Sequence, residues 1–388
     1  MICTDWDITC CKSAFGQERT VIPTNNLPLS CSLGCAVTVL DSEPDKNALE
    51  INSSKWISQK MKRKNITEYA FGYMNSYTAM MTAYQLMSGW SVNEGQDQLD
   101  KCHIYIIAAR PSSYFIGDSL KHDGKQLSGQ IAYKVAGVEC RVDFADFPFE
   151  LWDGATEIRC DYPFRDLWTY NSAGEQVRYL PATHVASILG ARNSEEVLNH
   201  FEVLYVGQAI GQGNRSAQQR LTSHSTFQKI LALSAYDTPD NEVVVFMFQF
   251  DHEQVFSSMD GRASGAITDS SNEKRLMNAI RNPPDKKQKI AMIEAGLIRY
   301  FQPHYNEIFK IKFPSTKHKT LQSCKALDVS ALIVELDTSD LGLTLRSPTV
   351  TASDHHIARY DLVNLQNRMS FFNVTGITEY PGVIKTEK

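Results

Sequence analysis

The sequence predicts an α+β fold, in which a small central mixed sheet flanked by helices lies between β-rich N-terminal and C-terminal regions. Three patterns lead to this expectation. Alternating β-branched and aromatic residues fill 102–180, apolar strands and helices with steps of three and four follow, and short strand-like runs return in 320–388. The expected domains are therefore 1–174, 175–313 and 314–388.

The composition is that of an ordinary globular protein and excludes several classes. The chain has 388 residues, of which 43% are hydrophobic and 21% charged, so collagen, coiled coil and global disorder are excluded. The net charge of −5 excludes a globally basic nucleic-acid binder but leaves a local basic surface open. We expect no membrane partner, because no run of about 18 apolar residues occurs. The start lacks the basic segment of a signal peptide.

Cysteine usage favours a reducing, cytoplasmic location. The chain has nine cysteines, an odd number that favours free thiols over a disulfide framework. Five of them lie in the turn-rich residues 1–54. A zinc site from Cys10, Cys11, Cys31 and Cys35 is open, but their spacing is not the C-x-x-C of common zinc sites.

Residues 55–88 are expected to form one or two helices. The run KWISQKMKRKN is basic, which indicates either a solvated helix face or a segment that contacts phosphate. After it, aromatic residues and methionines recur at steps of three and four from Ile66 to Tyr84, which predicts an amphipathic helix that packs in the core.

In two further regions the sequence contains no recognisable catalytic or metal-binding motif. The predicted strands of 102–180 are separated by glycine-containing turns, and His103 and His122 are expected to be structural or surface residues. Near the C-terminus, the polar stretch SPTVTASDHH lies between predicted strands. Because adjacent side chains diverge, we expect a surface loop there rather than a metal site.

The most informative segment starts at FEVLYVG, residues 201–207. It predicts a short strand that ends at Gly207, followed by a glycine-rich loop and a helix that begins near Ser216. Arg220 and His224 lie one turn apart on that helix and share a face with apolar side chains. Cations within an apolar stripe need a buried partner or an anion at the edge of a cleft.

A second predicted strand and helix complete this region. The nearly continuous apolar run 242–251 predicts a central strand, and a polar insertion with its own short helix follows at about 257–284. Residues 286–306 predict a helix that Pro303 ends. Glu294 lies in the middle of its apolar stripe, so its carboxylate needs a cation, a metal or strong donors.

In this order the residues resemble the GIY-YIG nuclease family. Four motifs match: Tyr205-Val206-Gly207 as its YIG half, Arg220 and His224 as its R-x-x-x-H helix, Glu294 as its lone metal-binding glutamate, and Pro303 with Asn306 as its P-x-x-N closure. The loop after the YIG half is more similar to the restriction-endonuclease branch. The family's first half, G-I-Y on a preceding strand, is not evident; the nearest candidate is Val177-Arg178-Tyr179.

The resemblance implies a metal-dependent endonuclease that hydrolyses phosphodiester bonds in DNA, in a restriction or phage-defence setting. Glu294 would hold Mg²⁺ or Mn²⁺, Arg220 would clamp the phosphate, and Tyr205 or Tyr179 would be the general base. His224 would relay the proton or form a hydrogen bond with the tyrosine, and Asn306 would orient the helix end or the tyrosines. The candidate nucleic-acid contacts are Gln208, Arg215, Lys286, Lys287, Lys289, Lys310 and Lys312.

Other readings remain open at this point. The domain could be a non-catalytic GIY-YIG-like nucleic-acid-binding module in a regulatory protein, which the missing G-I-Y motif favours, or an RNA-directed or structure-specific nuclease. Tyr205 and His224 could pack in the core, and Arg220 with Glu294 could form a buried salt bridge. A homo-oligomer is also open.

Overall fold

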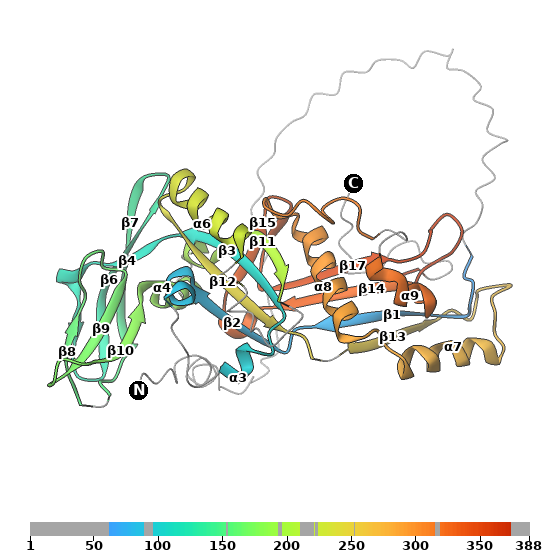
Figure 1. Ribbon diagram of the computed structural model, residues 1–388, viewed down its shortest axis with the longest axis horizontal. Helices are drawn as coiled ribbons and strands as arrows, with labels where there is room; N and C mark the ends of the chain where they lie inside the picture. Colours follow the sequence, from blue (N-terminus) through green and yellow to red (C-terminus); the bar gives the residue numbers. More distant parts are fainter. Residues whose placement is uncertain are drawn as a thin grey trace, which may run out of the picture.

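The computed structural model describes residues 62–88, 96–152, 154–192, 196–209, 221, 224–251, 253–314 and 319–373. It confirms an α+β fold in which small sheets carry a few helices. Three parts follow one another along the long axis: a β module, a central sheet and a second sheet covered by helices (Figure 1). The N-terminal cysteine cluster, Arg215 and Arg220 lie outside the described residues.

The central sheet has six strands and mixed direction. Its order is β16 (Val350–Ser353), β15 (Thr344–Ser347), β11 (His200–Gln208), β3 (Ile104–Pro111), β12 (Asn241–Gln249) and β2 (Tyr77–Thr82). Only β11 and β15 run parallel, and every other neighbouring pair is antiparallel. The strands predicted at 201–207 and 242–251 are confirmed as β11 and β12. Helix α6 (Ser225–Asp237) packs on one face of this sheet.

A four-stranded sheet continues the molecule. Its order is β13 (Glu253–Met259), β1 (Thr67–Met74), β14 (Ala331–Asp337) and β17 (His355–Asp361). Helices α7 (Ser270–Arg281) and α9 (Gln322–Ala326) lie at this end (Figure 1). The large core is shared: Ile293 and Leu297 of the long helix α8 (Lys286–Phe301) are buried in one cluster with side chains of both sheets.

Helix α8 confirms the helix predicted in 286–306, and local signals set both of its ends. Asp285 caps the first turn, because its side chain accepts from the Gln288 N–H while the Gln288 side chain accepts from the Asp285 N–H. The helix ends at Phe301, where Gln302 adopts a left-handed conformation, and Pro303 follows.

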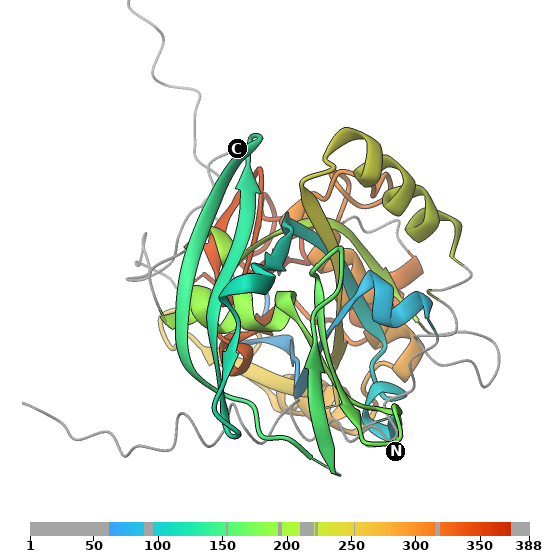
Figure 2. The same cartoon turned by 90° about the vertical axis from the view of Figure 1, so that its left-hand side faces the viewer.

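The β module is inserted between β3 and β11, two strands that are neighbours in the central sheet. Its elements are β4 (Ser113–Phe115), β5 (Lys121–His122), β6 (Gln126–Val135), β7 (Val138–Pro148), β8 (Ala155–Arg159), β9 (Asp166–Asn171), β10 (Gln176–Pro181) and α4 (Ala182–Arg192). They enclose a hydrophobic core of their own, which includes Phe115, Phe149 and Leu167. Figure 2 shows the long β6–β7 hairpin and the β8–β10 strands in front of the central sheet.

Arg110, near the end of β3, ties the β module to the central sheet. Its side chain is almost completely buried. Nε donates to Glu242 Oε1 at 2.9 Å, Nη1 donates to Ser187 Oγ at 3.0 Å and to the Leu198 carbonyl, and Nη2 donates to the Thr183 carbonyl at 2.5 Å. A buried guanidinium with this many acceptors holds both parts in one orientation.

The three expected regions do not fold as separate sheets. The central sheet takes β2 and β3 from 1–174, β11 and β12 from 175–313, and β15 and β16 from 314–388. The boundary expected near 174 instead falls inside the β module, between β9 and β10, which pair with each other. The sheet is assembled by pairings between segments far apart in the chain, which no local pattern reports.

Two local predictions are wrong. The stretch from Ile66 to Tyr84 forms β1, β2 and the short helix α2 (Ala83–Met87) instead of an amphipathic helix. Strand β1 is buried on both faces, so polar residues do not mark its period of two and the spacing of its aromatic residues resembled a helix. The polar stretch near 350 forms β16 and the start of β17, in which His356 is buried.

The described helices and cysteines bear on the expectations of no membrane partner and of free thiols. No helix among the described residues is both long and apolar enough to cross a membrane. Cys102, Cys140, Cys160 and Cys324, the cysteines that the structure describes, are all free thiols.

Candidate functional site

Strands β3 and β11 bring together the end of the YVG segment and a tyrosine from far upstream. They pair antiparallel with Tyr105 directly opposite Gly207. The register shifts between Val203 and Tyr205, which marks an irregularity of the β-bulge kind. Such a shift changes the direction of the following side chains, and here it sets the face from which Tyr205 projects.

Tyr105, Tyr205 and His224 form an aromatic cluster on the face of the sheet that α6 covers. The ring centroids are 6.1 Å apart for Tyr105–Tyr205, 6.4 Å for Tyr105–His224 and 6.0 Å for Tyr205–His224. Tyr105 is buried, whereas Tyr205 and His224 are half-buried. The cluster therefore unites two phenols and an imidazole beside partly accessible surface.

Gly207 makes room for this cluster. A Cβ at this position would lie 2.5 Å from both Cζ and Oη of Tyr105 and 2.8 Å from Cε1 of Tyr205. Real Cβ atoms do not approach other atoms so closely. The glycine that ends the YVG segment is therefore required because two tyrosine rings pack over its backbone.

His224 reaches the cluster in a way that the sequence did not predict. Helix α6 begins at Ser225, and His224 is its N-cap residue with an extended backbone, φ −82° and ψ 117°. The prediction that one helix continues through His224 is therefore wrong. Arg220 lies outside the described residues, so its expected position one turn before the histidine stays a prediction.

Asn306 binds the YVG strand directly. Its Oδ1 accepts from the Val206 N–H and its Nδ2 donates to the Val206 carbonyl, both at 2.9 Å. The neighbouring Tyr305 N–H donates to the Leu204 carbonyl at 3.1 Å. Strand β15 pairs with β11 only as far as Glu202, so these contacts satisfy the next part of the strand edge. They also fasten the segment after α8 to β11.

Glu294 is half-buried in the middle of the apolar side of α8. Ile290, Ile298 and Phe301, which surround it on the helix, are all buried. Helix α8 contacts β11 and β3. Its apolar residues share their core with Val206, whereas Tyr205 lies with the core on the other face. Glu294 is thus a half-buried residue on an apolar helix face, a position in which a carboxylate suits a hydrated divalent ion.

The first turn of α8 reaches the beginning of β3. His103 precedes that strand, and its carbonyl accepts from the Ala209 N–H at 2.7 Å. Burial and the charges of Lys286 and Lys289 lower the pKa of His103, while Asp251 acts in the opposite direction. Lys289 Nζ also donates to the Asp251 carbonyl at 2.9 Å. Cations therefore gather at the end of the sheet that carries Tyr105.

The other predicted contacts are divided between two places. Gln208, at the end of β11, pairs with Ile104 and lies beside the aromatic cluster in the sheet. Lys287 is exposed in the first turn of α8. Lys310 and Lys312 instead follow the C-terminal end of α8, where the Lys310 carbonyl accepts from Arg299 at 2.7 Å. None of their described contacts connects them to the cluster.

Tyr179 lies outside the cluster. It is buried on β10 in the β module, with its ring 4.6 Å from that of Trp168. Burial and the Asp166 carboxylate raise its pKa well above that of an ordinary tyrosine, and Glu242 adds to this. Glu242 contacts Arg110, so Tyr179 is placed at the opposite end of β3 from Tyr105. The structure thus separates Tyr179 from Tyr205.

Tyr105 is the residue that sequence reasoning missed. It follows His103 and Ile104, so the signal was an Ile-Tyr pair at the start of a predicted strand. About 100 residues separate it from the YVG segment, and most of them belong to the inserted β module. A search for a strand just before residue 201 could not find it.

The described residues contain no group of three or more His, Cys, Asp or Glu side chains arranged to hold a metal ion. Glu294 is therefore not part of a three-residue group of this kind among the described residues, and it would offer one carboxylate to a metal ion. Such an arrangement is compatible with Mg²⁺, which keeps several waters and is held by one or two carboxylates together with substrate phosphates.

Comparisons with known proteins give no relative for this chain. No family model, no curated protein and no solved structure matches it. Any functional conclusion must therefore come from the side chains and their arrangement.

Proposed function

We propose that the chain is a metal-dependent endonuclease that hydrolyses phosphodiester bonds in DNA with a GIY-YIG-type site. The observation that carries this proposal is the pairing of β3 with β11. It sets Tyr105 opposite Gly207, Ile104 opposite Gln208 and Ile106 opposite Val206. The strand pair thereby offers a candidate for the first motif half, which the segment around Tyr179 does not.

The aromatic cluster would supply the general base. Tyr105 or Tyr205 would accept a proton from the attacking water. His224, whose ring centroid lies 6.4 Å from that of Tyr105 and 6.0 Å from that of Tyr205, would take part in that transfer. A free tyrosine has a pKa of about 10, so either phenol needs cations nearby to act near neutral pH. Lys286 and Lys289 near the start of β3 contribute positive charge to this end of the sheet.

Glu294 would hold the divalent ion. Its carboxylate is half-buried within an apolar surface, which suits one ligand to a cation that keeps most of its water. When bound, Mg²⁺ or Mn²⁺ would stabilise the charge that develops on the phosphate oxygens. Asn306 would be a positioning residue, because its two bonds to Val206 fix the segment after α8 to the strand with Tyr205.

The charges of the first turn of α8 support an anionic substrate. Lys286, Lys287 and Lys289 occupy this turn and the position after it, and no acidic residue does. Positive side chains at a helix N-terminus oppose the helix dipole and cost stability. The same position attracts phosphate, since both the dipole and the lysines favour an anion.

A plasmid-nicking assay tests the proposal. The full chain is expected to nick supercoiled DNA with Mg²⁺ or Mn²⁺ and to lose this activity in EDTA. Glu294→Gln should lose at least about 100-fold in rate. The matched control is Glu202→Gln, which changes a partly exposed carboxylate on β11 and should retain the activity.

Each other result has a definite meaning. Equal cleavage by wild type and Glu294→Gln would remove this carboxylate from the mechanism. Tight DNA binding without cleavage in any divalent ion would favour a non-catalytic binding module. Cleavage of RNA alone would favour the RNA-directed nuclease and reject DNA as the substrate.

A further inference from the structure

Helix α7 carries a second candidate functional surface. This helix lies in the polar insertion between β12 and α8, and nothing in the proposed reaction uses it. Its hydrophobic contacts are few, since Ala279 is its one fully buried residue among those described. The helix is nevertheless firmly held by polar contacts on its inner side.

Arg275 provides most of that attachment. Its guanidinium lies over the Tyr69 ring at 4.4 Å from the centroid, and its Nη1 is 3.0 Å from Asp328 Oδ2 and 3.6 Å from Glu68 Oε2. It also donates to the carbonyl of Thr67. These contacts fix which face of α7 points toward the sheet.

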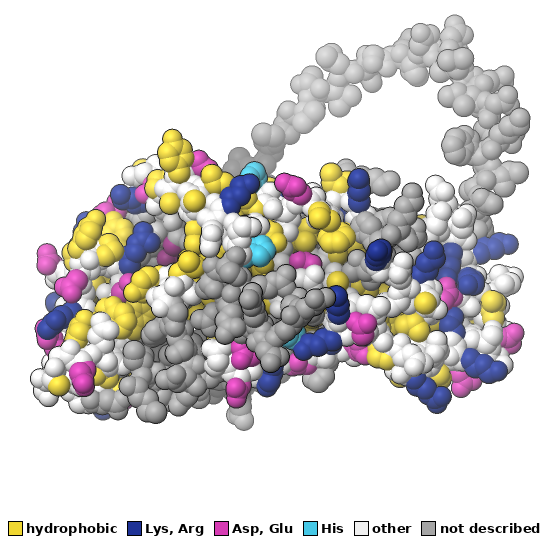
Figure 3. Space-filling model, viewed as in Figure 1, with side chains coloured by type: hydrophobic (Ala, Val, Ile, Leu, Met, Phe, Trp, Pro, Cys, Tyr) yellow, Lys and Arg dark blue, Asp and Glu magenta, His cyan; other side chains and the backbone are white. Residues whose placement is uncertain are grey.

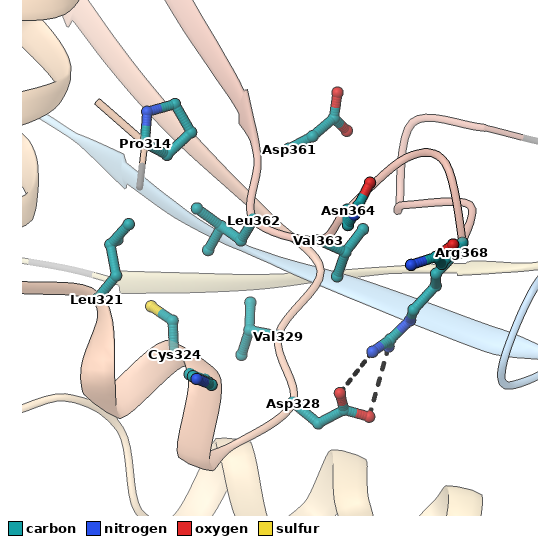
Figure 4. A pocket seen from close by; sticks show the side chains of 12 residues that line it. Pro314, Leu321, Cys324, Asp328, Val329, Asp361, Leu362, Val363, Asn364 and Arg368 are labelled. Carbon is teal, nitrogen blue, oxygen red and sulfur yellow. Dashed lines mark hydrogen bonds and ion pairs between the residues drawn. The ribbon is translucent and has the colours of Figure 1, made fainter. Parts of the chain in front are cut away.

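The charges behind the helix are already paired. Asp328 also binds Arg368, with 2.5 Å between Nη1 and Oδ1 (Figure 4). Lys64 Nζ lies 3.3 Å from Asp328 Oδ2. The cavity next to them, about 350 Å³, is bordered by Asp328 and Arg368. Because these groups neutralise each other, they form an internal anchor, and the outward face of α7 is the part that can meet a partner.

That outward face is a cationic stripe. Lys274, Asn278 and Arg281 are exposed and follow one another at steps of four and three, so they lie on the same side of the helix. Glu273 is about 100° around the helix from Lys274 and does not interrupt the stripe. From Lys274 to Arg281 the helix rises about 10 Å, which corresponds to about three phosphates along one strand of B-DNA.

The stripe continues into α8. Helix α7 ends at Arg281, and four residues, Asn-Pro-Pro-Asp, separate it from Lys286 and Lys287, which are both exposed. Lys286 in turn lies close enough to His103 for its charge to lower the pKa of that histidine. The row of cations therefore runs from the outside of α7 to the end of β3 that carries Tyr105.

Charge is distributed unevenly along the molecule. Residues 253–330, which include α7 and α8, contain thirteen Lys and Arg and eight Asp and Glu, whereas 113–198, which form the β module, contain eight and thirteen. Figure 3 shows Lys and Arg gathered at the end of the molecule that holds α7. The β module would repel a phosphate backbone, and the α7 end would attract it.

We propose that the outward face of α7 and the first turn of α8 form a phosphate-binding track that holds the nucleic-acid strand leading to the candidate site. The phosphates would be contacted by Lys274, Arg281, Lys286 and Lys287. The inference rests on the proposed function, and it assigns the backbone contact to this track rather than to the β module.

The test is a binding measurement on the full chain in the Glu294→Gln background, with a fluorescent 30-base-pair duplex at several salt concentrations. Lys274→Ala with Arg281→Ala should weaken binding at least about 10-fold and reduce the salt slope by about two, as for two lost phosphate contacts. The matched control is Lys125→Ala with Lys134→Ala, two exposed lysines of the β module, and it should leave the affinity almost unchanged.

Two results would overturn the track. Unchanged affinity in the α7 double variant would show that the duplex does not contact this helix. Equal weakening of binding in the α7 and β-module double variants would show that only the net charge of the protein matters. Thermal unfolding of both variants controls for folding, since all four side chains are exposed. Cleavage by the wild-type chain is measured in parallel, so that a failed track with intact cleavage leaves the proposed function standing.

Discussion

The two ends of β3 show what a buried charge and a partly exposed polar cluster each do in this fold. At one end, Arg110 is buried and surrounded by acceptors from Glu242, Ser187, Thr183 and Leu198. At the other end, about 17 Å along the strand, Tyr105 lies beside half-buried aromatic groups, and His103, two residues earlier, lies near the lysines of α8. One strand thus carries both a structural and a candidate chemical centre.

The difference between the ends lies in how deeply their polar groups are buried. The guanidinium of Arg110 has its hydrogen-bonding capacity spent on the protein, which suits an anchor for the inserted β module. Tyr205 and His224 are half-buried, and the lysines of α8 lie near His103 at the same end of β3, which suits proton transfer on an anionic substrate. Changes at the first end should alter stability, and changes at the second should alter rate.

The largest effect is expected from Arg110→Ala. The change leaves Glu242 without its cation and the carbonyls of Thr183 and Leu198 without the donor that Arg110 provides. The free energy of unfolding, measured in urea titrations, should therefore fall by about 3–5 kcal/mol. Arg159→Ala, which breaks an exposed pair with Glu157, is the control and should leave the unfolding midpoint nearly unchanged. Similar midpoints for both variants would refute the anchoring role of Arg110.

At the end of β3 that carries Tyr105, tyrosine-to-phenylalanine changes should lower the rate of DNA nicking while the protein stays folded. Tyr105→Phe and Tyr205→Phe keep the rings that pack over Gly207, so both variants should fold and unfold cooperatively. The variant that lacks the general base should lose about 100-fold or more in nicking rate. Tyr179→Phe is the control, and a loss of cleavage there with full activity in both other variants would return the role of base to Tyr179.

A smaller effect is expected from Asn306→Ala. The change leaves the N–H and carbonyl of Val206 without their partner in a buried position, which should cost about 2–3 kcal/mol of unfolding free energy. Because the strand with Tyr205 is then less firmly held, kcat should fall more than KM rises. Asn278→Ala on the exposed face of α7 is the stability control. An unaltered unfolding curve for Asn306→Ala would contradict the role of this clamp.

The smallest effect concerns pH at the anchor end. Burial and the charge of Arg110 lower the pKa of His184 to about 4, below its ordinary value of about 6.5. The unfolded chain therefore binds more protons between these values, and stability is lost as the pH falls from about 6.5 toward 4. Between pH 7.5 and 5 the contribution is about 2 kcal/mol. His184→Gln should flatten the urea-unfolding profile over this range, and an unchanged profile would exclude the effect.

Elements with strong local signals could be predicted from the sequence. The apolar runs of β11 and β12 identified two strands of the central sheet, and the stripe with Pro303 identified α8. The place of Glu294 within that stripe followed from helix geometry alone. These predictions succeeded because the information lies within a few residues of each element.

Other features depend on contacts that local patterns do not contain. Strand β1 is buried on both faces, so its sequence lacks the alternation that would separate it from a helix. His224 is an N-cap rather than a helical residue, although its spacing from Phe227 fits a helix. In both cases tertiary packing overrode the periodicity on which the prediction was based.

The sequence by itself determined the YVG strand, the carboxylate on α8 and the proline and asparagine that follow that helix. Only the tertiary structure decided that Tyr105 stands opposite Gly207, because strand pairing joins segments separated by the whole β module. It also decided that Asn306 clamps Val206, since the two residues are 100 positions apart. Hydrogen bonds across a sheet edge depend on which strands meet, and that choice is made by the packing of the complete chain.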